Sequence, residues 1–190
     1  MCSHACDPGR GGSLGPTDHR LLADPLEFIH EDHLREREIC SVIDLLPGLA
    51  TPQRGEADEA LAFLENELPL HLQDEEEDLF PLLKRRCQAE DEIGRAIQRL
   101  SADHEHALRD TPRVIDILRQ IARGENPLSN KEHRVLARFT YHARRHLTLE
   151  NAIILPFARL RLTEGDLETL RLRMMQRRGL DTLKETPDAQ

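Results

Sequence analysis

A duplicated pattern of histidine, glutamate and proline limits what this 190-residue chain can fold into. The motif His-x3-Glu-x5-Pro begins at His71 and begins again 75 positions later, at His146. An Asp-His pair ends at His33 and returns 71 positions later, at His104. The chain therefore repeats one arrangement, and each copy contributes one Asp-His pair and one His-x3-Glu motif.

The segments that carry these motifs have the spacing of amphipathic helices. Apolar residues recur at intervals of three and four. Aromatic residues make up only 3% of the chain and there is no tryptophan, which disfavours a β-sandwich or barrel. Proline, glycine and capping residues mark the helix ends. The expected helices cover about residues 25–46, 56–87, 90–123, 129–160 and 163–178, with Pro69 or Pro81 kinking the second and Pro112 interrupting the third.

Each of the four long helices carries a stripe that is apolar at both ends and polar in the middle. The stripes are Leu26, Ile29, His33, Cys40 and Ile43; Leu64, Leu68, His71, Glu75, Leu79 and Leu82; Ile93, Ile97, Leu100, His104, Leu108, Ile115 and Leu118; and Val135, Phe139, His142, His146, Glu150, Ile153 and Phe157. Short connections make neighbouring helices antiparallel. We therefore expect an all-α, up-down-up-down four-helix bundle over residues 24–160, a flexible tail containing glycine and cysteine over 1–23, a short C-terminal helix within 161–180 and a tail over 181–190.

The polar middle of the stripes predicts a metal site. His and Glu four residues apart project from one helix face, so two facing motifs bring two imidazoles and two carboxylates together. A lone histidine on an apolar stripe is usually a hydrogen-bonded core residue, but burying Glu75 and Glu150 without a partner would cost several kcal/mol. Six nitrogen and oxygen ligands suit two redox-active first-row metal ions bridged by carboxylates, and they favour iron or manganese over copper(I). The absence of cysteine from the pattern argues against iron–sulfur and structural zinc sites.

In these motifs the chain resembles the hemerythrin-like (HHE cation-binding) family. The resemblance covers about residues 24–160 and implies a hemerythrin-type bundle with a non-haem centre of two iron ions, oxo- or hydroxo-bridged. It implies His33, His71, His104 and His146 as terminal ligands and Glu75 and Glu150 as bridges. The oxygen-carrying members use five histidines, whereas the repeat here supplies four. The pattern is closer to members linked to iron–sulfur cluster repair and nitric oxide stress.

Several residues lie at the margin of the expected site. His142 stands one turn before His146 and could be a fifth ligand, a hydrogen-bond donor behind a ligand, or a half-buried core residue. His30 precedes His33 by three positions, and a surface role or a contact behind a ligand is favoured over ligation. Cys2 and Cys6 could bind metal or form a redox pair, with disorder as the alternative. Cys40 is expected to pack in the core. Glu76, Glu77 and Asp78 are expected on a solvated face, with Glu76 alternatively contacting a ligand.

Two classes of function fit these predictions, and ligand type does not separate them. The first is a module that binds or senses O2, NO or peroxide in redox or nitrosative stress. The second is a di-iron enzyme that reduces peroxide or NO, or an iron donor for iron–sulfur cluster repair. A structural zinc site is a third interpretation.

Charge and composition indicate which partners to expect. A formal net charge of −9 disfavours nucleic acid, and no apolar run approaches the roughly 18 residues of a membrane span. The first 20 residues lack an apolar segment, and four scattered cysteines point to a reducing, cytoplasmic location. The expected fifth helix has a basic side that could cap the bundle or contact a protein partner; it consists of Arg171, Arg173, Arg177 and Arg178.

Overall fold

The computed structural model describes residues 15–48, 54–125 and 127–180, so Cys2, Cys6 and the C-terminal tail lie outside the described residues. The described part of the chain is helical and contains no strand. Several of the helical segments follow one another without a loop, so that they form longer helices. The segments are η1 (His19–Ala23), α1 (Pro25–Leu45), η2 (Leu46–Gly48), α2 (Arg54–Ala62), η3 (Phe63–Glu67), α3 (Leu68–Asp74), η4 (Glu75–Leu79), α4 (Phe80–Arg86), η5 (Ala89–Asp91), α5 (Ile93–Ala122), α6 (Asn130–Leu149), η6 (Glu150–Ile154), α7 (Leu155–Arg161) and α8 (Glu164–Arg177).

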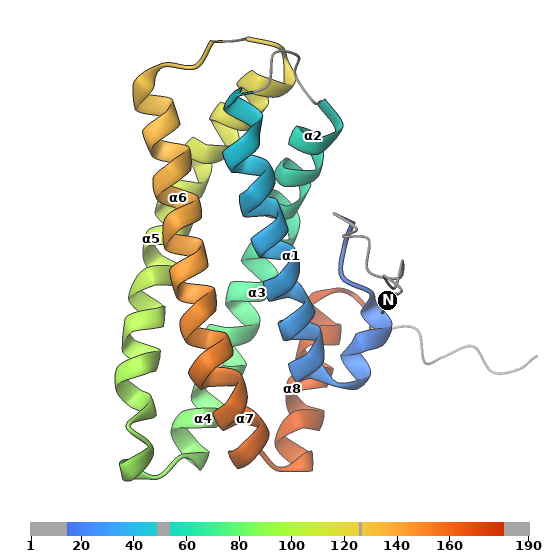
Figure 1. The fold of residues 1–190 in the computed structure, drawn as a ribbon. Helices are drawn as coiled ribbons and strands as arrows, with labels where there is room; N and C mark the ends of the chain where they lie inside the picture. Colours follow the sequence, from blue (N-terminus) through green and yellow to red (C-terminus); the bar gives the residue numbers. More distant parts are fainter. Residues whose placement is uncertain (1–14, 49–53, 126, 181–190) are drawn as a thin grey trace, which may run out of the picture.

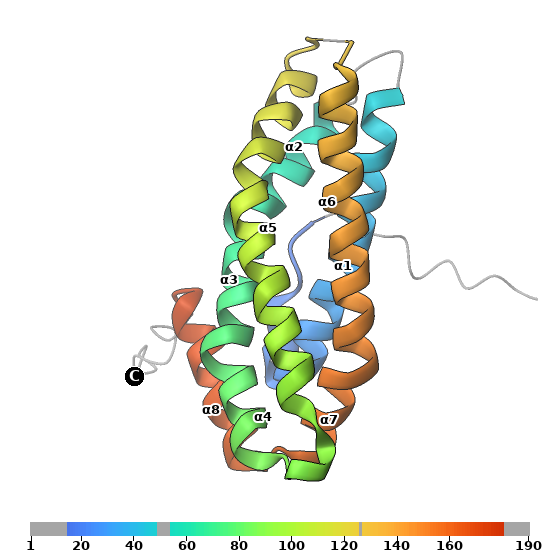
Figure 2. The ribbon, with the colours of Figure 1, turned by 90° about the vertical axis from the view of Figure 1, so that its left-hand side faces the viewer.

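The long helices form the predicted up-down-up-down bundle (Figure 1). Helix α1 runs in one direction, the continuous helix from α2 to α4 returns, α5 runs parallel to α1, and α6 with α7 returns again. Helix α1 packs against α2 and α6, and α5 packs against the same two neighbours (Figure 2). The helix α8 lies outside the bundle, against α1 and α3.

Local signals begin and end these helices where the sequence predicted. The Asp24 side chain accepts hydrogen bonds from the backbone N–H groups at the start of α1, and Pro25 occupies the first helical position. Ser129 and Thr163 each form a capping box with the acidic residue three positions later. Gly124 follows α5 with φ 75°, a backbone conformation that favours glycine because it has no Cβ.

Three prolines explain the π-helical segments. Proline lacks an N–H group and its ring collides with the carbonyl four residues earlier. Each of η3, η4 and η6 stands directly before a segment whose second residue is proline: Pro69, Pro81 and Pro156. In η4 the N–H of Phe80 donates to the carbonyl of Glu75, five residues earlier. The expected kink in the second helix is therefore a widened turn, and the helix continues through both prolines.

The widened turn in η6 corrects the predicted stripe of the fourth helix. A π turn contains an extra residue, so every later side chain shifts around the axis. The sequence predicted Ile153 and Phe157 on the core face, but both are only partly buried. Ile154 and Ala158 occupy the core instead, and each is fully buried.

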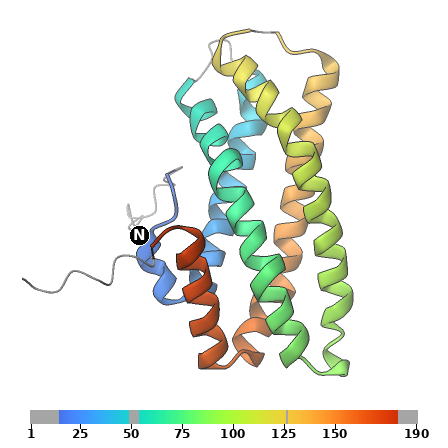
Figure 3. The same ribbon diagram turned by 180° about the vertical axis from the view of Figure 1, so that it is seen from behind.

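The expected interruption at Pro112 is wrong, because α5 runs through this residue from Ile93 to Ala122. Helix α5 bends instead (Figure 3). The Thr111 hydroxyl donates to the carbonyl of Ala107 at 2.7 Å, next to the turn that the proline disturbs. Beyond the middle of the helix the core face also differs from the predicted stripe. Leu108 is 52% exposed, whereas Val114 and Ile117 are fully buried.

Two apolar clusters fill the bundle, one on each side of a polar layer. One cluster is built around Ile29, Leu79 and Ile97, and the other around Ile43, Leu64 and Leu118, all of which lie on the predicted stripes. Cys40 is buried, as expected for a packing residue, and burial raises the pKa of its thiol. In the polar layer between the clusters lie the buried histidines and glutamates of the repeated motifs.

The helix α8 and the segment before α1 lie together on one side of the bundle. Residues 19–23, expected as part of a tail, form η1, and Leu22 is buried in the same apolar cluster as Met174 of α8. The arginines on the basic side of α8 pair within the chain. Arg173, Arg177 and Arg178 contact carboxylates of α3 and η4, and Arg171 contacts Glu168. None of the described helices is long and apolar enough to span a membrane.

Candidate metal centre

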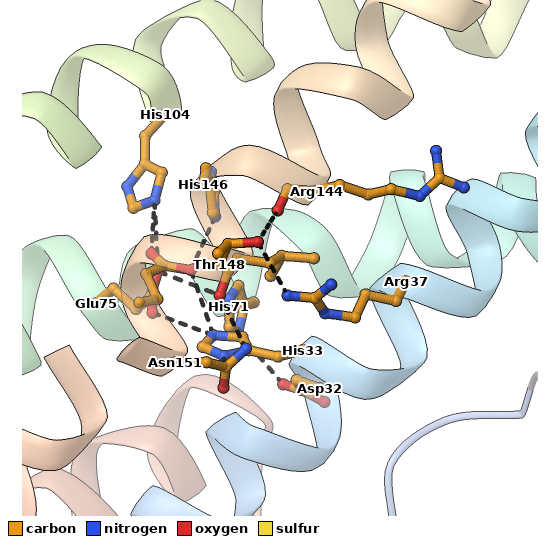
Figure 4. Close-up of polar contacts among 12 residues, drawn as sticks. Asp32, His33, Arg37, His71, Glu75, His104, Arg144, His146, Thr148 and Asn151 are labelled. Carbon is orange, nitrogen blue, oxygen red and sulfur yellow. Dashed lines mark hydrogen bonds and ion pairs between the residues drawn. The ribbon is translucent and has the colours of Figure 1, made fainter. Parts of the chain in front are cut away.

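The structure brings the six side chains of the repeated motifs into one place. His33 comes from α1, His71 from α3, His104 from α5 and His146 from α6, while Glu75 and Glu150 begin the π-helical segments η4 and η6. All six residues are at most 4% exposed. Figure 4 shows His33 and His71 on one side of the Glu75 carboxylate and His104 and His146 on the other.

The two carboxylates are shared between two pairs of histidines. One group of ligand atoms comes from His33, His71, Glu75 and Glu150, and the other comes from Glu75, His104, His146 and Glu150. Within each group all the atoms lie within 4.8 Å of one another. The ring Nε2 atoms of His33 and His104 each lie within 3.5 Å of an oxygen of both glutamates. Each group would hold one metal ion, and both carboxylates belong to both groups.

The atoms that point into the centre have no hydrogen-bond partner among the described residues. They are the Nε2 atoms of the four histidines and both carboxylate oxygens of Glu75 and Glu150. Buried polar atoms are almost always hydrogen-bonded, since leaving them unpaired is costly. Metal ions would satisfy these nitrogen and oxygen atoms, so the residues present fit a pair of metal ions.

The outer ring nitrogens of His33 and His104, by contrast, meet hydrogen-bond partners, and that of His71 lies near a carboxylate. The Nδ1 atom of His104 lies 2.7 Å from Glu76 Oε1, and Nδ1 of His33 lies 3.2 Å from Asn151 Oδ1. His71 Nδ1 forms a longer ion pair with Asp32, at 3.6 Å. Metal-bound histidines usually donate their second N–H group in this way, which fixes the ring and its tautomer. Glu76 therefore contacts the candidate ligand His104. Of the two positions that the sequence left open for Glu76, this is the alternative to the solvated face.

The charged groups at the centre shift the pKa values of His71, His104 and Glu150. Burial alone would lower the pKa of His71, but Glu75 and Asp32 outweigh it and raise the pKa to about 10. Burial likewise opposes protonation of His104, but Glu150, Glu76 and Glu75 raise its pKa to about 10. Burial would raise the pKa of Glu150, but the neighbouring histidines hold it well below its usual range. Without metal, protonated imidazoles balance the buried carboxylates.

Metal binding should therefore release protons. At about pH 8 the metal-free protein holds His71 and His104 protonated, and both must deprotonate to become ligands. We expect at least about two protons per chain to be released on loading with iron at this pH, because His71 and His104 each lose one and a bridging hydroxo or oxo group formed from water would add to them; calorimetry in buffers of different ionisation enthalpy measures the release. Because both folded-state pKa values lie above the ordinary 6.5, this contribution to the stability of the metal-free protein is full below about pH 6.5 and declines as the pH rises toward 10. Proton release near zero at pH 8 would contradict this electrostatic description.

Glu76 offers a test of the outer contacts. Glu76 also accepts a hydrogen bond from the Ser101 hydroxyl at 2.9 Å, which holds its carboxylate beside His104. Replacing Glu76 with alanine should lower metal affinity roughly tenfold to a hundredfold, because His104 loses the group that orients its ring. Competition against a chromophoric chelator measures this affinity. The neighbouring exposed Glu77→Ala variant is the control, and equal affinities for the two variants would contradict the role of Glu76.

Two histidines that the sequence placed at the margin are not in the centre. His142 is exposed, and it belongs to neither group of ligand atoms. His30 is partly buried, lies 3.9 Å from Glu27 and is likewise in neither group at the centre. Asp78 differs from its predicted solvated face, since it is buried and paired with Arg173 and Arg177 of α8.

Sequence reasoning missed two residues near the centre, Asn151 and Glu36. Asn151 follows Glu150 directly, and the widened turn brings its amide to His33. Glu36 is only 4% exposed and lines a cavity of about 420 Å³ together with His146. Burial raises the pKa of Glu36, and the nearby imidazoles oppose this only in part. Its position one turn after His33 on the predicted stripe was a signal that could have identified it.

Comparison with known families agrees with this geometry. The model of the hemerythrin HHE cation-binding domain matches residues 24–158, which include all six central residues and the helices from α1 to α6. Neither the comparison with curated proteins nor the comparison with solved structures finds a match. The matched region covers well over half of the chain, and its two groups of buried histidine and glutamate can hold metal ions. The chain therefore belongs to the hemerythrin HHE cation-binding family.

Proposed function

We propose that this protein is a non-haem di-iron protein that binds or senses O2, NO or peroxide in redox or nitrosative stress. The observation that carries the proposal is the sharing of Glu75 and Glu150 between two pairs of histidines, with every inward-facing atom lacking a hydrogen-bond partner among the described residues. His33 and His71 would hold one iron ion, and His104 and His146 the other. The two glutamates would bridge them, alongside an oxo or hydroxo group.

The donor set supports iron as the metal. Imidazole nitrogen and carboxylate oxygen together suit iron, and no cysteine belongs to either group. Inward-facing glutamate and histidine in a helical bundle are a known setting for di-iron centres. The free thiol of Cys40 is buried and belongs to neither group of candidate ligands, and it fits the reducing cytoplasm that we propose as the location.

Different residues of the chain would have different roles at this centre. A bound iron pair would supply a redox couple and open coordination positions for a small molecule. Glu76, Asn151 and Asp32 orient the histidines that they contact. The apolar clusters on either side keep bulk water away from the centre, and the cavity beside His146 provides space through which a small molecule can approach.

The test is a set of optical spectra of the iron-loaded protein. The protein is loaded with ferrous ion without oxygen, and O2, NO and hydrogen peroxide are then added separately. At least one of them should change the iron-dependent absorption in proportion to the iron bound, and Glu75→Ala, which removes a bridge, should abolish that change. Iron spectra that respond to none of the three would contradict the proposal.

A second candidate function is an enzyme that reduces peroxide or NO, or a donor of iron for iron–sulfur cluster repair. The cavity favours it, because polar and charged side chains line a space that reaches His146. A buried carboxyl on the wall, Glu36, is unlike the apolar surroundings expected of a site that only stores a neutral gas. Repeated consumption of peroxide or NO with an added reductant would identify the enzyme, whereas a single response per centre would favour the sensor.

A further inference from the structure

The cavity beside His146 extends from the protein surface toward the centre, between α1, α5 and α6. Its buried lining residues include Glu36 from α1 and His146 from α6. Its more accessible lining residues include Asp103 and His106 from α5 and His142 from α6, of which the two histidines are exposed. Side chains that can bind metal therefore occur both where the cavity is open and where it meets a candidate ligand.

Glu36 is unusual among the buried charged residues of this protein. It is 96% removed from solvent, and it makes no hydrogen bond or ion pair with any other residue that the structure describes. Its neighbour Arg35, by contrast, pairs with Glu67. A carboxyl group with so little access to solvent is costly without a hydrogen-bond or ion-pair partner, and a cation in the cavity would supply one. The side chain lines the cavity, where such a partner would pass.

The accessible residues have a matching chemistry. Asp103, His106 and His142 make no hydrogen bond or ion pair within the described part of the chain, whereas the two arginines of the cavity both approach Asp110. Arg138 donates to Asp110 at 3.0 Å, and Arg109 lies 3.9 Å from it. Imidazole and carboxylate groups thus remain available to an ion. They do not form a group compact enough to retain one, which suits brief contacts better than storage.

The centre requires a route of this kind. Its six candidate ligands are at most 4% exposed, so an ion cannot reach them from the solvent without an opening. We propose that this cavity is the uptake route for the ferrous ion: Asp103, His106 and His142 collect the ion at the surface, and Glu36 passes it to His146. This role rests on the proposed iron centre, and it assigns a purpose to two histidines that the centre does not use.

The test follows iron uptake rather than activity. Metal-free protein is mixed with ferrous ion in the absence of oxygen, a chelator removes unbound ion after varied times, and the iron bound is counted. Glu36→Gln keeps the shape of the side chain but removes its charge, and it should slow uptake by at least about tenfold, since charge in a cavity concentrates the approaching counter-ion. The double variant His106→Ala/His142→Ala should also load more slowly. Both variants should finally bind as much iron as the unchanged protein.

Matched controls come from the same helices. Glu38 on α1 and His133 on α6 are exposed and do not line the cavity, so Glu38→Gln and His133→Ala should load at the unchanged rate. Uptake by Glu36→Gln and by the double histidine variant at the control rate would overturn the uptake route while leaving the iron centre intact. A lower final iron content in Glu36→Gln would also overturn it, because Glu36 would then be a ligand. Failure of the unchanged protein to bind a pair of iron ions would overturn the iron centre and the route together.

Discussion

Replacing Glu75 or Glu150 with alanine should abolish binding of the metal pair. Each carboxylate belongs to both groups of ligand atoms, so removing either one takes a ligand from both ions. Bound metal stabilises the folded state, by about 4 kcal/mol when free metal is present at a thousand times its dissociation constant. Both variants should lose this stabilisation. The buried imidazoles and the one carboxylate that remain would then have no metal ion to bind. Metal content and thermal unfolding with and without iron measure the two effects.

Glu77 is the matched control for these variants. It lies two residues after Glu75 in the same π-helical segment, but its side chain is 54% exposed. Glu77→Ala should keep the metal pair and the stabilisation by iron. Equal losses in Glu75→Ala and Glu77→Ala would show that the bridging role assigned to Glu75 is wrong.

Replacing Asp74 with alanine should destabilise the protein by about 3–5 kcal/mol, because it leaves buried cations without their partner. Asp74 is completely buried, and its carboxylate accepts hydrogen bonds from Arg177 at 2.6 Å and from Arg178 at 2.7 Å. The Arg178 side chain is itself only 7% exposed, and its guanidinium lies 4.7 Å from the ring centre of Phe28. Asp74 therefore holds α8 against the helix that carries His71 and Glu75. Chemical denaturation of the metal-free protein measures the loss without any contribution from bound iron.

Glu77→Ala is also the control for the destabilisation expected of Asp74→Ala. Glu77 also pairs with Arg177, at 3.2 Å, but on the exposed side of the cluster. An exposed ion pair contributes roughly 0–1 kcal/mol, so Glu77→Ala should have a small effect. If Asp74→Ala cost no more than Glu77→Ala, the contacts between α8 and the bundle would be surface pairs that contribute little to stability.

The candidate ligands could be predicted because their spacing is a local property. His and Glu four residues apart must share a helix face, and the repetition of the motif places two such faces opposite each other. Capping residues such as Asp24 and Thr163 act within one turn, so they marked the helix ends reliably. The bundle and the polar layer followed from these local signals together with the apolar stripes.

The misplaced residues have a different physical origin. A regular period of 3.6 residues cannot anticipate the extra residue in η6, which moved Ile154 into the position expected for Ile153. The same widened turn brings Asn151 to His33. Proline in a helix can widen a turn, as before Pro156, or allow a bend, as at Pro112. Which of these occurs depends on how the neighbouring helices pack.

Other features depend on residues far apart in the chain. Asp78 looked solvated because its sequence neighbours are acidic, but Arg173 and Arg177, about a hundred positions later, bury it. Glu36 and His146 line the same cavity only because α1 and α6 pack against each other. The pairing of Asp78 leaves no periodic signal in the sequence, and the cavity that Glu36 shares with His146 could not be found before the helices were placed.

The most direct test of the iron centre is the metal content of the protein produced with iron available, measured together with its optical spectrum. The shared glutamates and the two histidine pairs predict about two iron ions per chain and an absorption that depends on iron. His142→Ala should retain the same content, because His142 is exposed and lies outside both groups. One zinc ion per chain with no iron-dependent absorption would contradict the di-iron centre.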